Sequence, residues 1–313
     1  MPSNRSGPGI ADPRRRPAAR ESARGGNGGR GGAPRRRSGS AARRRRRIAV
    51  LLVFAVGLGA ALWFGGRLFV SSVANPRCTI TAGGMTETFD PEQTGNAALI
   101  SALSIKRKMP PRAATIALTT AFQESKIRNL RYGDRDSLGL FQQRPSQGWG
   151  TESQILDPVH ATNAFYDALV KFKGYETADI TTIAQRVQKS GFPEAYRDHE
   201  GQGRVLASTL TGHSPAGLTC RLDAVTSRET PQEVAADLKT QMGVTTARPG
   251  DGFLTVTTRN ATTAWAVAHW AVARAQSTGA TKVAIGERAW DRASGGDGWS
   301  KGAASTTVTI TLR

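Results

Sequence analysis

One glutamate stands where an apolar helix is expected to end. The stretch 112–125, RAATIALTTAFQES, is typical of a helix, and Glu124 falls in its last turn. Small and apolar residues recur along one side of that stretch: Ala114, Ala117, Leu118, Ala121 and Phe122. Burial raises the pKa of a carboxyl group, and the negative end of a helix raises it further. A glutamate kept protonated in this way is suited to general acid catalysis; a solvated helix glutamate is the alternative.

Polar and aromatic side chains follow this glutamate in a segment that favours turns. Residues 126–150 contain Gly133, Gly139, Pro145 and Gly148, which are typical of turns and short strands. The segment also offers two amides and two aromatic rings of the kinds that hold sugars: Gln142, Gln143, Tyr132 and Trp149. For the two aromatic residues, core packing is the alternative.

Three aspartates leave the reaction type open. Asp134 and Asp136 follow Glu124, and a carboxylate facing Glu124 across a cleft would activate water for hydrolysis. Turn formation beside the preceding glycine is the alternative for both. Asp157 precedes a proline and is typical of a helix N-cap.

The order of these motifs resembles a known enzyme family. QES at 123–125, SLGLFQQRPS at 137–146, and the pair Asp157–Pro158 ahead of Asn163 resemble the soluble lytic transglycosylase branch of the lysozyme superfamily. The resemblance covers residues 94–211 and implies a mainly helical, lysozyme-like domain. Within the second motif, Gly139 corresponds to a turn glycine and Gln142 to a sugar-binding amide.

The resemblance also implies a substrate and a reaction. The family cleaves the β-1,4 bond between N-acetylmuramic acid and N-acetylglucosamine in peptidoglycan, and leaves 1,6-anhydro-muramyl ends. It implies that Glu124 is the single acid and base, that Ser125 helps to orient the acid or the sugar, and that peptidoglycan glycan strands are the partner. A muramidase that hydrolyses the same bond and a catalytically inert wall-binding or scaffold protein are the alternatives.

One later motif departs from the family pattern. The family carries Tyr-Asn-Ala-Gly on a later helix, whereas the nearest stretch here is AQRVQKSGFPEAY, with Gln188 in place of the asparagine and Val187 in place of the tyrosine. Gln188 is therefore a candidate substrate contact. Tyr196, farther along the same stretch, is the alternative tyrosine for the cleft.

The cysteine and histidine residues indicate a disulfide and give no metal site. Cys78 and Cys220 flank the central segment, so we expect them to pair; two free thiols are the alternative. The four histidines show no ligand spacing, and GGNGGRGG lacks the preceding strand of a phosphate-binding loop. We expect no metal and no cofactor.

The first part of the chain predicts a tail and a membrane span. Residues 1–47 hold 15 arginines and two acids, which is typical of a disordered tail, and residues 48–66 carry no charge. We expect a single transmembrane helix over 48–70, with the arginine side cytoplasmic and the remainder outside; cleavage near Ala74 or a buried helix are the alternatives. Arg43–Arg47 are expected to contact anionic lipid. No aromatic residue interleaves with the arginines, so no nucleic-acid partner is expected.

The last segment predicts a separate small domain. Residues 221–313 show a helix, a strand, a second helix rich in tryptophan, and strands at 281–290 and 305–313, and no catalytic set. The fold class predicted for the chain is α+β: a tail over 1–47, a span over 48–70, an extended lead-in over 71–93, a lysozyme-like domain over 94–220 and a small α/β domain over 221–313. The net charge of +19 belongs mostly to the tail.

Overall fold

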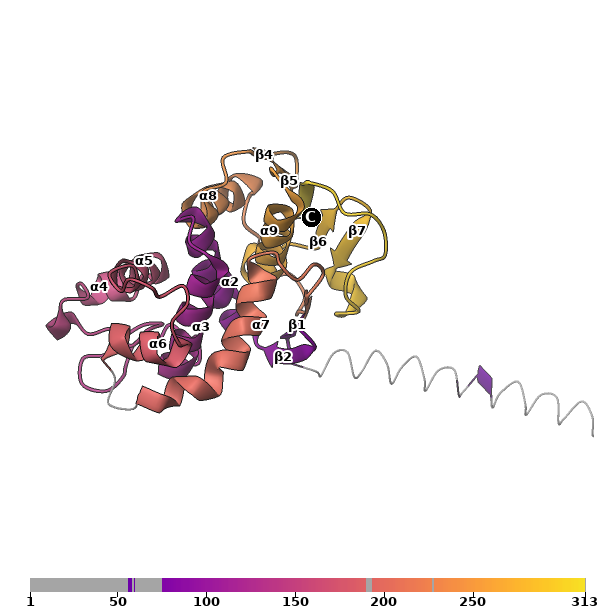
Figure 1. The fold of residues 1–313 in the computed structure, drawn as a ribbon. Coiled ribbons are helices and arrows are strands. Elements are labelled where there is room, and N and C mark those ends of the chain that lie inside the picture. Colours follow the sequence, from indigo (N-terminus) through magenta and orange to yellow (C-terminus); the bar gives the residue numbers. More distant parts are fainter. Residues whose placement is uncertain (1–55, 58, 60–74, 190–192, 227, 313) are drawn as a thin grey trace, which may run out of the picture. The chain divides into compact units, whose positions relative to one another are not determined.

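The structure is a computed structural model that describes residues 75–189, 193–226 and 228–312, together with Val56, Gly57 and Gly59 (Figure 1). The chain divides into two compact units, Met1–Gly66 and Arg67–Arg313. Of the first unit only those three residues are described, and they are helical. The second unit holds every residue that the sequence singles out for chemistry.

The α+β class is confirmed, but the membrane prediction is wrong. Among the described residues no helix is both long and apolar enough to cross a bilayer, which contradicts the transmembrane helix expected over 48–70 and the single-pass location inferred from it. The longest described helix, α2 (Pro91–Lys106), has 16 residues, fewer than the roughly 20 apolar residues of a bilayer span. The remainder of 48–70, and the tail predicted over 1–47, lie outside the described residues.

A small antiparallel sheet joins the start of the described chain to its middle. The strands β1 (Arg77–Ala82), β2 (Met85–Phe89) and β3 (Leu218–Arg221) lie in the order β2–β1–β3. Cys78 is directly opposite Cys220 in the register, and the two form the predicted disulfide. The bond spans 142 residues of sequence, and such a loop closure contributes about 5 kcal/mol to the free energy of unfolding.

Between β2 and β3 the chain is mainly helical. After α2 come α3 (Pro111–Ser125), η1 (Pro145–Gln147), α4 (Glu152–Ile155), α5 (Pro158–Leu169), α6 (Ile180–Gln188), η2 (Pro193–His199) and α7 (Glu200–Leu210). Helix α3 is central, because α2, α5, α6 and α7 all pack on it. Its approach to α7 is close: a Cβ on Gly203 would lie 2.2 Å from Thr119 Oγ1. The core thus fixes the position of the end of α3, where Glu124 stands.

Local sequence signals set the ends of these helices. Asp90 caps α2 in a reciprocal capping box with Gln93, so the helix begins at Pro91, inside the stretch 71–93 for which the sequence predicts an extended lead-in. Pro110 and Pro111 separate α2 from α3, since neither can continue the preceding helix. Asp157 caps α5 by accepting the N–H of Val159 at 2.9 Å, as predicted.

After β3 the chain forms a five-stranded antiparallel sheet in the order β4–β5–β8–β6–β7. Its elements are α8 (Pro231–Met242), β4 (Ala247–Pro249), β5 (Phe253–Thr257), α9 (Ala261–Ala273), α10 (Ala275–Thr278), β6 (Lys282–Ile285), β7 (Arg288–Asp291), η3 (Arg292–Ser294) and β8 (Thr307–Thr311). The single strand expected over 281–290 is instead the hairpin β6–β7. Gly286 makes this turn possible, because its φ of 63° lies in the left-handed region.

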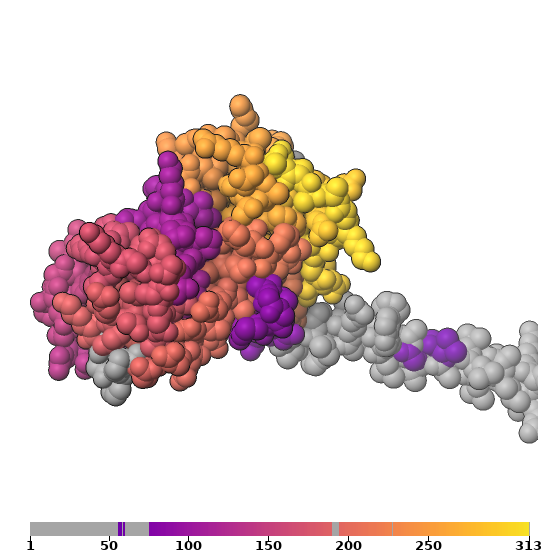
Figure 2. Space-filling view, viewed as in Figure 1, coloured from indigo at the N-terminus to yellow at the C-terminus, as the bar shows by residue number. Residues whose placement is uncertain are grey.

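Helix α9 joins the last segment to the helical part. It is buried along most of its length and packs against α2, α7 and the sheet. His269, fully buried on α9, donates from Nδ1 to the carbonyl oxygen of Thr209 at 2.7 Å. On the face shown in Figure 2, the orange and yellow C-terminal residues lie directly against the helical part. The boundary predicted after residue 220 therefore falls inside one compact unit.

Candidate active site

Glu124 stands in the last turn of α3, where the helix meets the loop that follows it. The helix ends because Lys126 takes a left-handed conformation, with φ 56°. Ser125 Oγ lies 2.7 Å from the carbonyl oxygen of Leu140 and accepts the N–H of Arg128 at 3.1 Å. Because Ser125 is buried, it fastens the helix end to this loop and is not placed to touch a substrate directly.

Tyr196 holds the Glu124 carboxyl group. The Tyr196 hydroxyl donates to Glu124 Oε1 over 2.6 Å, and the tyrosine side chain is fully buried in η2. The Gln188 side chain, at the end of α6, also hydrogen-bonds to the Glu124 carboxyl. Gln188 is itself held, because its Nε2 donates to the carbonyl oxygen of Phe141 at 2.7 Å. Of the two tyrosine positions considered from the sequence, Tyr196 is thus the one that reaches the acid.

Opposing effects set the pKa of Glu124. Burial raises it, while the hydrogen bonds from Tyr196 and Gln188 lower it by stabilising the carboxylate. Burial is the larger effect, so the pKa lies above the ordinary value of 4.5. The direction agrees with the sequence prediction for this residue. A raised pKa keeps a larger fraction of the carboxyl protonated and able to donate a proton as the pH approaches neutrality.

In the loop after α3, Gly139 and Gln142 adopt a left-handed backbone conformation. Gly139 has φ 76°, and a Cβ there would lie 2.7 Å from the backbone oxygen of Ile155, so only glycine fits. Gln142 has φ 46°, and its Nε2 donates to the carbonyl oxygens of Tyr132 and Gly139, each at 3.3 Å. The Gln142 amide therefore joins two parts of the same loop and stabilises its conformation.

The remaining predicted sugar contacts of the loop lie apart from the acid. Gln143 is 1% exposed and donates to the carbonyl oxygen of Ala161 at 3.1 Å, so it packs between the loop and α5 where a glycan has no access. Tyr132 is 73% exposed on the surface. Neither side chain is among the described neighbours of the Glu124 carboxyl.

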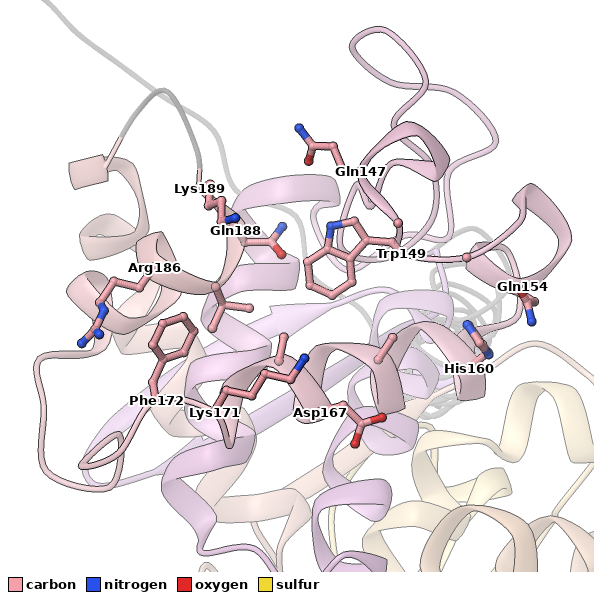
Figure 3. Close-up of a pocket in the computed structure, with 15 residues that line it drawn as sticks. Gln147, Trp149, Gln154, His160, Asp167, Lys171, Phe172, Arg186, Gln188 and Lys189 are labelled. Atoms are coloured by element: carbon pink, nitrogen blue, oxygen red, sulfur yellow. The ribbon is translucent and has the colours of Figure 1, made fainter.

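A large pocket is lined in part by Gln188, and Glu124 is not among its lining residues. It has a volume of about 840 Å³ and is lined by residues of η1, α4, α5 and α6 and of the turns that follow η1, α5 and α6. Figure 3 shows the Trp149 ring and the Gln188 amide pointing toward one another. Trp149 lines the pocket and also packs against the core, so stacking on a sugar stays a prediction for this residue.

Neither nearby aspartate is placed as a second catalytic carboxylate. Asp136 pairs with Arg144 at 2.6 Å and accepts the N–H of Ser146 at 2.8 Å. The bonds from Ser146 and then from Arg144 lower the pKa of Asp136, so it stays ionised and engaged in the loop. The Asp134 side chain is 91% exposed. Both aspartates thus belong to the turns of this loop, which was the alternative to a catalytic role.

The described residues contain no group of three or more histidine, cysteine, aspartate or glutamate side chains able to hold a metal ion. Three cationic side chains that the sequence alone does not single out line the pocket: Lys171, Arg186 and Lys189. Arg186 and Lys189 flank Val187–Gln188, which stands where the family carries its later motif. The signal was missed because a basic residue on a short helix is usually solvated.

The chain matches no protein-family model, and a search of curated proteins finds no match either. The resemblance to lytic transglycosylases therefore remains a prediction from the motifs.

Proposed function

We propose that this protein is a peptidoglycan lytic transglycosylase that cleaves the β-1,4 bond between N-acetylmuramic acid and N-acetylglucosamine. The observation that carries the proposal is the environment of Glu124: a carboxyl at a helix end, with a pKa raised by burial and a 2.6 Å hydrogen bond from Tyr196. These are the properties of a residue that must give up a proton and then take one back.

The first step needs Glu124 protonated. Glu124 donates its proton to the glycosidic oxygen as the bond to the muramyl anomeric carbon breaks, and positive charge develops on the sugar ring. The Glu124 carboxylate that forms is stabilised by the hydrogen bonds from Tyr196 and Gln188, which strengthen as the negative charge appears.

The second step returns the proton. The muramyl 6-hydroxyl attacks the anomeric carbon and loses its proton to the Glu124 carboxylate. The product carries a 1,6-anhydro ring, no water is consumed, and Glu124 is protonated again for the next cycle. One carboxyl group therefore serves as acid and then as base.

A single-carboxyl reaction fits this site better than hydrolysis. A hydrolase ordinarily needs a second carboxylate opposite the acid, to activate water or to attack the sugar. Asp136 is committed to Arg144 and to the Ser146 amide, and Asp134 points to solvent. The pocket lined by Gln188 and Trp149 has room for part of a glycan, and Gln188 is the residue that it shares with the surroundings of the acid.

Digestion of purified peptidoglycan by the full chain tests the proposal. Wild type is compared with Glu124→Gln, which keeps the shape of the side chain but cannot donate the proton. Glu176→Gln, an exposed glutamate outside the site, is the control. Released fragments are identified by mass spectrometry.

We expect anhydro-muramyl products from wild type and from Glu176→Gln, and none from Glu124→Gln. Reducing-end products, heavier by one water, would replace the lyase with a muramidase. Binding of glycan by folded wild type without any release would replace the enzyme with a wall-binding protein.

A further inference from the structure

The pocket beside Gln188 carries more positive charge than a neutral glycan requires. Its aromatic walls, Trp149 and Phe172, are suited to sugar rings (Figure 3). Three cationic side chains line it as well: Lys171, Arg186 and Lys189. The sugar rings of a glycan strand are uncharged, so these cations indicate a ligand that also carries negative charge.

The three cations have no carboxylate partner among the described residues. Lys171 follows α5, Arg186 lies in the last turn of α6, and Lys189 is the C-cap of α6; no ion pair in the described part of the chain involves any of them. The one carboxylate of the lining, Asp167, is paired with Arg107 at 2.6 Å. The pocket is therefore positive and its cations are available to an anion.

The aromatic wall also orients one of these cations. The guanidinium carbon of Arg186 lies 4.6 Å from the centroid of the Phe172 ring, a cation–π arrangement, which by itself uses none of the guanidinium N–H donors. Figure 3 shows the Lys171 side chain reaching into the pocket from the end of α5. Arginine and lysine donors placed this way match carboxylate oxygens.

We infer that this pocket binds the carboxylates of the peptide attached to the muramyl residues of the strand. The inference rests on the proposed function and names the part of the substrate that the pocket takes. Each muramyl residue bears a lactyl group that is amide-linked to a short peptide, and the anionic groups of the peptide-bearing strand are the carboxylates of that peptide. An anion on the same glycan strand is favoured over an unrelated anionic ligand, because Gln188 both lines the pocket and hydrogen-bonds to Glu124.

Binding measurements on the full chain test this assignment. Labelled glycan strands with their peptides are compared with the same strands after the carboxylates of the peptides have been converted to amides, which removes the negative charge and keeps the peptides. All proteins carry Glu124→Gln, so that bound strands are not cut, and affinity is read by fluorescence anisotropy. Residues 1–47 carry 15 arginines and attract any acidic polymer, so each comparison is made between variants of the same full chain.

The test variant is Lys171→Gln with Lys189→Gln. The matched control, Lys173→Gln with Lys239→Gln, removes the same charge from two exposed lysines that do not line the pocket. An exposed ion pair is worth about 0.2–1 kcal/mol, so we expect the test variant to bind the strands with free peptide carboxylates about 2- to 30-fold more weakly. Its affinity for the amidated strands should be unchanged, and the control should bind both kinds of strand like the parent.

Equal affinity of the parent for both strands overturns the assignment, as does an equal loss on both strands in the test variant. Tighter, lysine-dependent binding of a phosphate-containing wall polymer would overturn the peptide in favour of phosphate. Digestion by the chain with Glu124 intact separates the two proposals. Binding that depends on the peptide carboxylates, without cleavage, would keep the pocket assignment and refute the proposed reaction. Cleavage that is equally fast on both kinds of strand, with equal binding of both, would keep the reaction and refute the pocket assignment.

Discussion

Replacing Tyr196 by phenylalanine removes one hydroxyl group, the donor of the 2.6 Å hydrogen bond to Glu124 Oε1. The ring stays, so packing in the fully buried η2 position is nearly preserved. Gln188 still donates to the carboxyl. The variant therefore isolates the contribution of a single donor to an ionised carboxylate.

The expected cost depends on the charge of Glu124. A hydrogen bond to a charged group contributes about 1.5–3 kcal/mol, against about 0.5–1.5 kcal/mol for a neutral pair. When Glu124 is ionised the variant loses a hydrogen bond to a charged carboxylate, and when Glu124 is protonated it loses one to a neutral carboxyl; the ionised fraction is larger at pH 8 than at pH 4. Tyr196→Phe should thus lower the free energy of unfolding more at pH 8 than at pH 4, and urea denaturation at both pH values measures the difference.

Catalysis should change in the same sense. The Tyr196 bond stabilises the carboxylate, so its loss raises the pKa of Glu124 further above 4.5. The descending limb of kcat/KM, where the acid loses its proton, should then move to higher pH. The plateau should fall about ten- to hundredfold, because the donor is missing when the negative charge develops.

A folded Tyr196→Phe protein with the wild-type pH profile and plateau would refute this reasoning. So would a stability loss that is the same at pH 4 and at pH 8. Either result would mean that the Tyr196 hydroxyl does not act on the ionised carboxylate.

Two further predictions concern the scaffold. Gly139→Ala should lower the free energy of unfolding by about 1–3 kcal/mol and reduce peptidoglycan release, because φ is 76° and the new Cβ would lie 2.7 Å from the Ile155 backbone oxygen. Chemical denaturation measures the first effect and digestion of peptidoglycan the second. An unchanged denaturation midpoint would contradict the prediction. Burial lowers the pKa of His269 from 6.5 to about 4. Between these two pH values the unfolded state therefore binds a proton that the folded state does not. The free energy of unfolding should thus rise by about 3 kcal/mol from pH 4 to pH 6.5 and stay constant at higher pH. His269→Asn should remove that rise in denaturation curves, and an unchanged rise would assign it to other groups.

The sequence predicts the part of the site that depends on a local pattern. The apolar stretch 112–125 and the prolines before it are enough to expect a helix with Glu124 at its end. Asp157 as an N-cap follows equally from its proline neighbour. These features need no knowledge of what packs on the helix.

Features that depend on distant packing were not predictable in the same way. Gln143 has the side chain of a sugar ligand, yet it is buried against Ala161, because the fold of the loop decides which of two adjacent amides faces inward. The pattern over 281–290 predicts one strand and the structure has a hairpin at Gly286, since an isolated glycine within a strand pattern predicts a bulge as readily as a turn. The expected membrane helix rested on an uncharged run and its flanking arginines, and no described helix meets the requirement for a span.

The disulfide between Cys78 and Cys220 makes the chain between them a covalent ring. Glu124, Gln188 and Tyr196 are all members of that ring. A protease that cuts the ring once opens it without releasing a fragment, so the acid and its two hydrogen-bond donors stay tethered to each other. Two cuts, or one cut together with reduction, are needed before any of them can leave. The site is thus protected against backbone scission by topology as well as by packing.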